Sequence, residues 1–116
     1  MKFICLVYAE PDALSSLTPE QRTALDRDSL AYDQWLEANG HFLAASALQA
    51  VRTARTVRMR EGKVLVTDGP FAETKEVLCG FIFVEAAGAD EALRIAERIP
   101  MARYGAIEVR AELDFG

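Results

Sequence analysis

Two short stretches of this chain are apolar at almost every position, so each predicts a strand that is covered on both faces. They are residues 3–8 (FICLVY) and residues 81–84 (FIFV). A strand with one face in water would alternate apolar and polar side chains instead. Such alternation does occur over residues 107–110, where a last strand is expected. A further short strand is expected to open at His41 and to run through Leu43 to Ala47.

A long helix is predicted after the first strand. Thr18 fits an N-cap, Pro19 the first helical position and Gln21 the position that completes a capping box. Asn39-Gly40 is a typical helix end. Helical spacing predicts that the apolar stripe of this helix contains Leu25, Tyr32, Trp35 and Leu36.

A second helix is predicted from residues 88–91, where acidic residues suit the first turn, to just before Pro100. Its expected stripe is Ala92, Leu93, Ala96 and Ile99. Between the two halves, residues 52–67 predict a hairpin that turns at Glu61-Gly62. Four arginines and one lysine gather in this hairpin. We interpret them as protection of an exposed edge rather than as an anion-binding patch.

This order of elements is β-α-β, hairpin, β-α-β, which predicts an α+β, ferredoxin-like βαββαβ fold with an inserted β-hairpin. Both helices should cover one face of a four-stranded antiparallel sheet. The other face would leave Ile4, Leu6, Tyr8 and half of residues 81–84 uncovered. We therefore expect a homodimer in which two sheets pack face to face.

Composition narrows the classes of function. The chain of 116 residues is long enough for a single domain over 1–116, and its net charge of −5 disfavours a nucleic-acid partner or an anionic membrane. No apolar run approaches the roughly 18 residues of a membrane span. One histidine and two cysteines predict neither a metal site, a cofactor nor a disulfide framework. Cys5 and Cys79 are interpreted as small buried hydrophobes, and a cytoplasmic protein is expected.

Residues 68–81 (DGPFAETKEVLCGF) carry a resemblance to a known family. They resemble the signature of the DGPF branch of the YCII-related family, supported by Tyr8-Ala9, Gly80-Phe81, Ile99-Pro100, Gly105 and residues 107–110. The resemblance covers nearly the whole chain. It implies a dimeric α+β barrel of bacterial origin and unknown function. Some members are encoded beside extracytoplasmic-function sigma factors, which implies a sigma-factor-linked regulatory partner.

Relatives with a proposed enzymatic role use a His–Asp pair between the sheet and the first helix. The first helix here contains no histidine, and the family position falls near Asp28 or Ser29. His41 follows a helix end, so we expect it in a surface loop, although a general base is an alternative. Asp28 either marks a site on the buried stripe or lies at its edge and reaches water.

Two main functions remain open from the residues. The first is a small-molecule-binding or regulatory accessory protein, with a pocket centred on the DGPF loop. The second is an enzyme that performs lyase- or isomerase-like proton transfer on a small organic acid. The candidate catalytic residues are Asp68, Asp28 and Glu108, and the candidate ligand-binding residues are Tyr8, Tyr32, Phe71, Arg103 and Tyr104. Convergence of Asp68 with Asp28 or Glu108 around a cavity would favour chemistry, and a solvent-facing Asp68 would favour a scaffold. Nucleic-acid binding through the arginine hairpin is the weakest interpretation, since no aromatic residues interleave.

Overall fold

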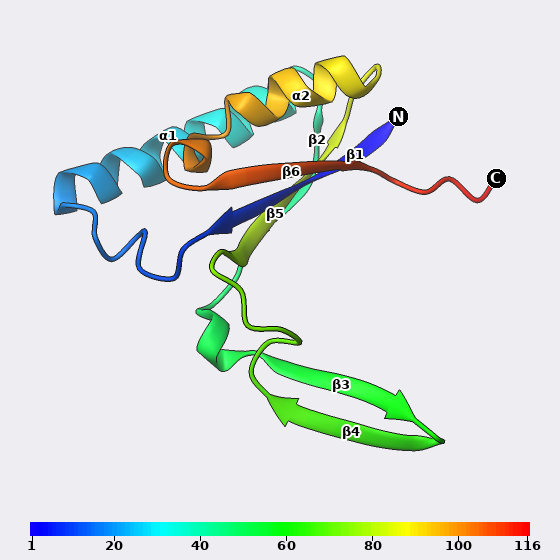
Figure 1. Cartoon of the computed structure of the whole chain (residues 1–116). Helices are drawn as coiled ribbons and strands as arrows, with labels where there is room; N and C mark the ends of the chain where they lie inside the picture. The colour runs from blue at the N-terminus through cyan, green and yellow to red at the C-terminus, as the bar shows by residue number, and fades with distance from the viewer.

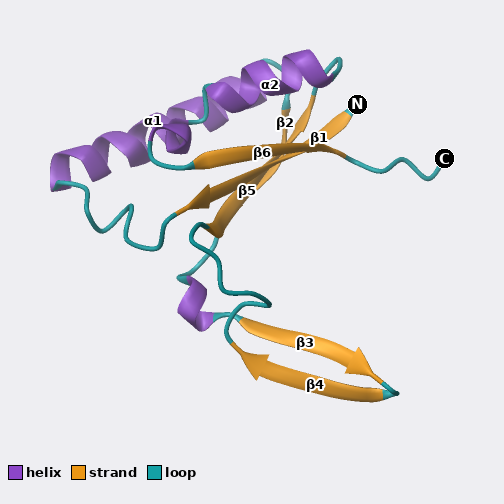
Figure 2. Cartoon of the chain, in the orientation of Figure 1, coloured by secondary structure: helices purple, strands orange, loops and turns teal.

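The computed structural model describes residues 1–116 and forms a four-stranded antiparallel sheet with two α-helices on one face (Figure 1). The strand order is β2-β5-β1-β6, as expected for a ferredoxin-like α+β chain. A separate two-stranded sheet pairs β3 with β4 (Figure 2). The elements are β1 (Lys2–Ala9), α1 (Pro19–Ala38), β2 (Phe42–Ala47), η1 (Val51–Thr53), β3 (Arg55–Arg60), β4 (Lys63–Asp68), β5 (Val77–Glu85), α2 (Ala89–Glu97), η2 (Pro100–Arg103) and β6 (Ala106–Ala111).

The ends of α1 confirm the sequence prediction. The Thr18 hydroxyl accepts a hydrogen bond from the Gln21 backbone N–H at 3.1 Å, and the Gln21 side chain accepts one from the Thr18 N–H at 2.9 Å. This reciprocal capping box satisfies two N–H groups that would otherwise lack partners. At the other end, Gly40 takes φ of +77°, a conformation that suits glycine after a helix. Neither α1 nor α2 combines the length and apolar composition needed to cross a membrane.

The two faces of the sheet differ because side chains alternate along each strand. Phe3, Cys5 and Val7 of β1 point toward the helices and are buried. The intervening side chains of β1 point to the face that no helix covers, and they are only half-buried. The main core lies between the sheet and the helices and contains Phe3, Cys5, Tyr32, Leu36, Ile82, Val84, Ala86, Ala92, Ile95, Ala96 and Ile99.

The predicted stripe of α2 needs one correction. Leu93 is 55% exposed, whereas Ile95, which the prediction omitted, is 4% exposed. Ala92, Ile95, Ala96 and Ile99 follow the i, i+3, i+4, i+7 spacing of one helix face, and Leu93 falls outside it. The second helix therefore packs as expected, with one member of its stripe exchanged.

His41 lies in the short connection between α1 and β2, as predicted, but its side chain is packed. Its side chain is only 19% exposed, and its ring stacks on that of Trp35, with 6.0 Å between the centroids. Nδ1 of His41 lies 2.8 Å from the Glu85 carbonyl oxygen. Arg98 covers the Trp35 ring, with its guanidinium carbon 4.3 Å from the centroid. His41 therefore belongs to a packed structural stack outside the cavity described below.

Residues 55–68, which we name the arm, extend from the rest of the chain, which we name the body. The arm lies on the side of the sheet opposite the helices (Figure 1). Because of this extension the radius of gyration is 16.1 Å, compared with about 13 Å for a compact chain of this length. The strands β3 and β4 pair with each other, and neither packs broadly against another helix or strand. The hairpin prediction is confirmed, including its turn at Glu61-Gly62.

Candidate functional site

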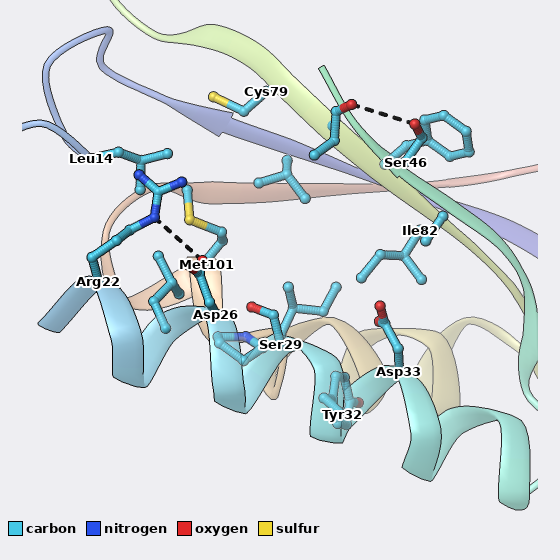
Figure 3. A pocket seen from close by; sticks show the side chains of 18 residues that line it. Leu14, Arg22, Asp26, Ser29, Tyr32, Asp33, Ser46, Cys79, Ile82 and Met101 are labelled. Atoms are coloured by element: carbon cyan, nitrogen blue, oxygen red, sulfur yellow. Dashed lines mark hydrogen bonds and ion pairs between the residues drawn. The ribbon is translucent and has the colours of Figure 1, made fainter. Parts of the chain in front are cut away.

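A cavity of about 370 Å³ lies between α1 and the helix-facing side of the sheet (Figure 3). Eleven of its 18 lining residues are hydrophobic. Such a volume and such a lining are typical of small-molecule sites. The lining residues are Val7, Leu14, Arg22, Leu25, Asp26, Ser29, Tyr32, Asp33, Ala45, Ser46, Ala47, Cys79, Gly80, Phe81, Ile82, Ile99, Pro100 and Met101.

The polar side of this cavity comes from a single stripe of α1. Arg22, Asp26, Ser29 and Asp33 are spaced by four, three and four residues, so they share one helix face. Arg22 and Asp26 form an exposed ion pair, with Nε 3.3 Å from Oδ1. The side chains of Ser29 and Asp33 point from the helix toward the sheet (Figure 3). The ion pair therefore occupies one end of the stripe, and Ser29 and Asp33 supply unpaired oxygen atoms farther along it.

Asp33 has the most distinctive chemistry in the cavity. It is half-buried, and its carboxylate makes no hydrogen bond or ion pair within the chain. Burial raises the pKa of the Asp33 carboxyl above its ordinary value. A carboxylate of raised pKa without a partner can accept a hydrogen bond or a proton from a bound molecule. Asp33 is therefore the group on which we build the site.

Tyr32, one of the candidate ligand-binding residues, lines the same cavity. Its hydroxyl donates a 2.7 Å hydrogen bond to the Ile95 carbonyl oxygen, which ties α1 to α2. Burial also raises the pKa of this hydroxyl. The ring can thus form a wall of the site, while the hydroxyl is already engaged; its contact with a ligand stays a prediction.

The two cysteines are free thiols. Cys5 is completely buried, and burial raises its pKa to about 11. Cys79 lines the cavity, where burial raises the pKa of its thiol, and its Sγ lies 3.3 Å from the Val77 carbonyl oxygen. A raised pKa keeps a thiol protonated and weakly nucleophilic. The interpretation of both residues as small hydrophobes therefore fits their surroundings.

The three carboxylates predicted to be catalytic do not converge within one chain. Asp28 accepts a hydrogen bond from Arg103 Nη1 at 3.0 Å, and this bond lowers the pKa of the Asp28 carboxyl. The side chain of Asp68, at the end of β4 in the arm, is 94% exposed and lies 3.6 Å from Arg55. Glu108 pairs with Leu6 in the sheet, so it points to the face away from α1.

Strand alternation and the projection of the arm are the physical reasons for this separation. Asp28 and Glu108 lie on opposite sides of the sheet, and Asp68 belongs to a part of the chain that leaves the body. Arg103, at the end of η2, and Tyr104, which follows it, line neither this cavity nor the second cavity described below. The functional roles expected of these five residues stay predictions, but no single cavity of the chain gathers them.

A second cavity, of about 790 Å³, lies at the root of the arm beside the DGPF loop. It brings together two predicted ligand-binding residues, Tyr8 of β1 and Phe71 of the loop. Phe71 is 77% exposed, and Glu76 is the one carboxylate in the lining. A cavity thus lies beside the DGPF loop, but it is separate from the cavity under α1 and contains only two of the predicted site residues.

Hydrogen bonds connect the DGPF loop to β3 and to Ala54, the residue before it. The Gly69 N–H donates to the Ala54 carbonyl oxygen at 2.7 Å, and the Thr56 hydroxyl donates to the Gly69 carbonyl oxygen at 2.9 Å. Arg58 Nη2 donates to the Phe71 carbonyl oxygen at 3.1 Å. Gly69 has φ of +96°, a conformation that strongly favours glycine. The loop thus closes the base of the arm.

The signal that would have pointed to Asp33 was present in the sequence. Arg22, Asp26, Ser29 and Asp33 flank the predicted apolar stripe of Leu25, Tyr32 and Leu36 on one side. A polar column beside an apolar stripe can be a solvated edge or the wall of a cavity. Helical spacing alone does not separate these two cases.

Sequence comparison shows the family. The YCII-related domain matches residues 1–115, so this chain belongs to the YCII-related family. An uncharacterized protein of Rhizobium meliloti, R00369, is 34% identical over 112 residues, which cover 95% of this chain and 90% of that protein.

A solved structure supports the fold. The 5-chloro-2-hydroxyhydroquinone dehydrochlorinase TftG of Burkholderia phenoliruptrix, solved in complex with 2,5-dihydroxybenzoquinone, is similar with a TM-score of 0.57. The match covers 100% of this chain and 96% of that structure, at 19% sequence identity. The two proteins therefore share the ferredoxin-like arrangement of helices and sheet.

Proposed function

We propose that this YCII-related protein binds a small, hydroxyl-bearing organic molecule in the cavity between α1 and the sheet, with Asp33 as the acceptor. The observation that carries this proposal is the unpaired, half-buried Asp33 carboxylate in a mostly apolar cavity of about 370 Å³. The carboxylate oxygens of Asp33 have no donor within the chain and stay accessible, so a molecule in the cavity can reach them. A ligand hydroxyl supplies that donor.

The charges of the cavity select against an anionic ligand. Arg22 is paired with Asp26, and Arg103, one of the candidate ligand-binding residues, is paired with Asp28. No unpaired cation among the lining residues offsets the negative charge of Asp33. A neutral hydroxylated ring therefore fits better than an organic acid. The named substrate of the dehydrochlorinase of similar fold is also a hydroxylated ring, which supports the same size class.

We also propose that the chain forms a homodimer, a dimeric α+β barrel in which the two uncovered sheet faces pack together. On that face β1 and β5 present Ile4, Leu6, Tyr8, Phe81 and Phe83. These side chains are half-buried in the single chain and lie opposite the face covered by helices. Packing two such faces together removes apolar surface from water, at about 25 cal/mol for each Å².

A thermal-shift titration with two matched probes tests the binding proposal. Hydroquinone is neutral, and 4-hydroxybenzoate is a comparable ring with an added carboxylate. We expect hydroquinone to raise the melting midpoint of the wild type by mass action and 4-hydroxybenzoate to have a smaller effect. The shift should weaken in Asp33→Asn, because the amide oxygen is an acceptor without the charge of the carboxylate. It should persist in full in Asp68→Asn, which makes the same change on the exposed arm. Loss of the shift in Asp68→Asn alone would contradict the proposal and return the site to the DGPF loop.

Acid–base catalysis at the same site is a second candidate, favoured by the raised pKa of Asp33. Asp33 would accept the proton of a bound ring hydroxyl while a ring carbon takes a deuteron from D₂O. Loss of the original proton from that carbon to the deuteroxide left in solvent, with return of the proton from Asp33 to the ring oxygen, would restore the aromatic ring with deuterium in place of hydrogen. Proton NMR of the probe in D₂O measures this exchange as loss of a ring signal. The wild type should accelerate it and Asp33→Asn should not; equal rates with both proteins would leave binding as the function.

A further inference from the structure

The apolar side of the arm has no partner within the chain. Cross-strand pairing places Val57 opposite Val66 and Met59 opposite Val64, so these four side chains share one face. They are 66%, 58%, 59% and 60% exposed, respectively. We name them the arm face. The opposite side of the ribbon carries Arg58, Arg60, Lys63, Leu65 and two threonines.

A two-stranded ribbon of this kind is marginally stable in water by itself. Four exposed apolar side chains in register also form a patch that soluble chains normally cover. Neither β3 nor β4 packs broadly against the body, so the covering surface has to come from another molecule.

Charge and position identify that molecule as a second copy of this chain. The arm contains four basic and two acidic residues, whereas the rest of the chain contains nine basic and sixteen acidic residues. The net charge is thus +2 on the arm and −7 on the rest of a copy, and this difference in sign favours the approach of an arm to another copy. The basic residues Arg58, Arg60 and Lys63 lie on the side of the ribbon opposite the arm face, so the contact itself is apolar. The arm also leaves the body on the side of the uncovered sheet face (Figure 1). A second copy seated on that face therefore lies beside the arm.

We propose that in the homodimer the arm of each copy packs its arm face, formed by Val57, Met59, Val64 and Val66, against the body of the other copy. The DGPF loop acts as the root that sets the direction of the arm through its bonds to Ala54, Thr56 and Arg58. This inference rests on the homodimer of the proposed function, and it assigns the most specific motif of the sequence a role in assembly.

Neighbouring positions of β4 offer a matched pair of variants. Val66→Asp places a charge on the arm face, and Thr67→Asp places the same charge on the opposite side of the same strand. Sedimentation equilibrium measures the dimer dissociation constant of each. We expect Val66→Asp to raise it by about tenfold or more, because an unpaired charge is buried, and Thr67→Asp to change it by about twofold or less. Equal constants for the two variants would overturn the arm contact while leaving the homodimer in place.

Hydrogen exchange of the wild type provides a second readout that needs no variant. Backbone N–H groups in an undocked ribbon open and exchange readily, whereas a docked ribbon is protected. We expect protection of β3 and β4 that is lost on dilution into the monomer range. Rapid exchange of the arm in a sample shown to be dimeric would also overturn the contact. A wild type that is monomeric at every concentration would instead refute the homodimer itself and this inference with it.

Discussion

The body and the arm differ in how far their apolar side chains are buried. The body encloses Leu36, Val84 and Cys5 completely between the sheet and the helices, whereas the arm leaves four aligned apolar side chains between 58 and 66% exposed. The cavity with Asp33 belongs to the body, and the DGPF loop belongs to the root of the arm. Under our proposals, the binding site is therefore completed by a single chain, whereas the arm is covered only by a second copy.

The comparison predicts very different costs for truncating an apolar residue in the two regions. Leu36→Ala removes a completely buried side chain and should lower the free energy of unfolding by about 2–5 kcal/mol. Val66→Ala, in the arm, should change it by about 0.5 kcal/mol or less at protein concentrations where the chain is monomeric. Urea unfolding at low concentration measures both. A Val66→Ala cost close to that of Leu36→Ala would show that the arm packs within its own chain.

An alanine substitution that strains the backbone at the root of the arm should affect assembly more than folding of the body. Gly69 has φ of +96° and Gly62, at the tip, has φ of +75°. Alanine at either position costs about 1–2 kcal/mol in that conformation. Because only Gly69 lies in the root, we expect Gly69→Ala to weaken dimerisation more than Gly62→Ala, as measured by sedimentation. The reverse order would argue that the tip, and not the root, determines the contact.

The smallest expected effect is a change in how stability depends on pH. Burial raises the pKa of Asp33 in the folded chain above its unfolded value, so folding becomes less favourable as pH rises from the unfolded pKa through the folded pKa. Asp33→Asn removes this term. The variant should therefore gain stability relative to the wild type between acidic and neutral pH, as measured by unfolding at a series of pH values. A constant difference across that range would show that Asp33 is not perturbed by burial.

Much of the fold was predictable because its signals are local. The capping box of Thr18 and Gln21, the glycine at position 40 and the Glu61-Gly62 turn each specify an element boundary by backbone chemistry. The strands that are apolar on both faces predicted a sheet with a second face to cover. Leu93 was misplaced because a nine-residue helix contains few turns, and a shift of one or two positions selects a neighbouring residue for its buried stripe.

The site was predicted less well because it depends on packing between distant elements. The family resemblance implied a site between the sheet and the first helix, and Tyr32 does line the cavity there, but Asp33 joins that cavity only through the positions of β2 and β5. The direction of the arm follows from contacts at Gly69 and Phe71, which the pattern of residues 52–67 does not contain. The carboxylate of the DGPF motif suggested catalysis, whereas the hydrogen bonds of this loop join it to the base of the arm.

A pH titration of the side-chain carboxyl ¹³C signals of Asp33 and Asp28 by NMR tests the assignment of Asp33 as the acceptor. We expect Asp33 to titrate above the ordinary value of 3.8 for aspartate and Asp28, bonded to Arg103, to titrate below it. Addition of hydroquinone should then move the Asp33 signal and leave that of Asp28 in place. An Asp33 that titrates at or below the ordinary value and ignores the probe would contradict the assignment of the site.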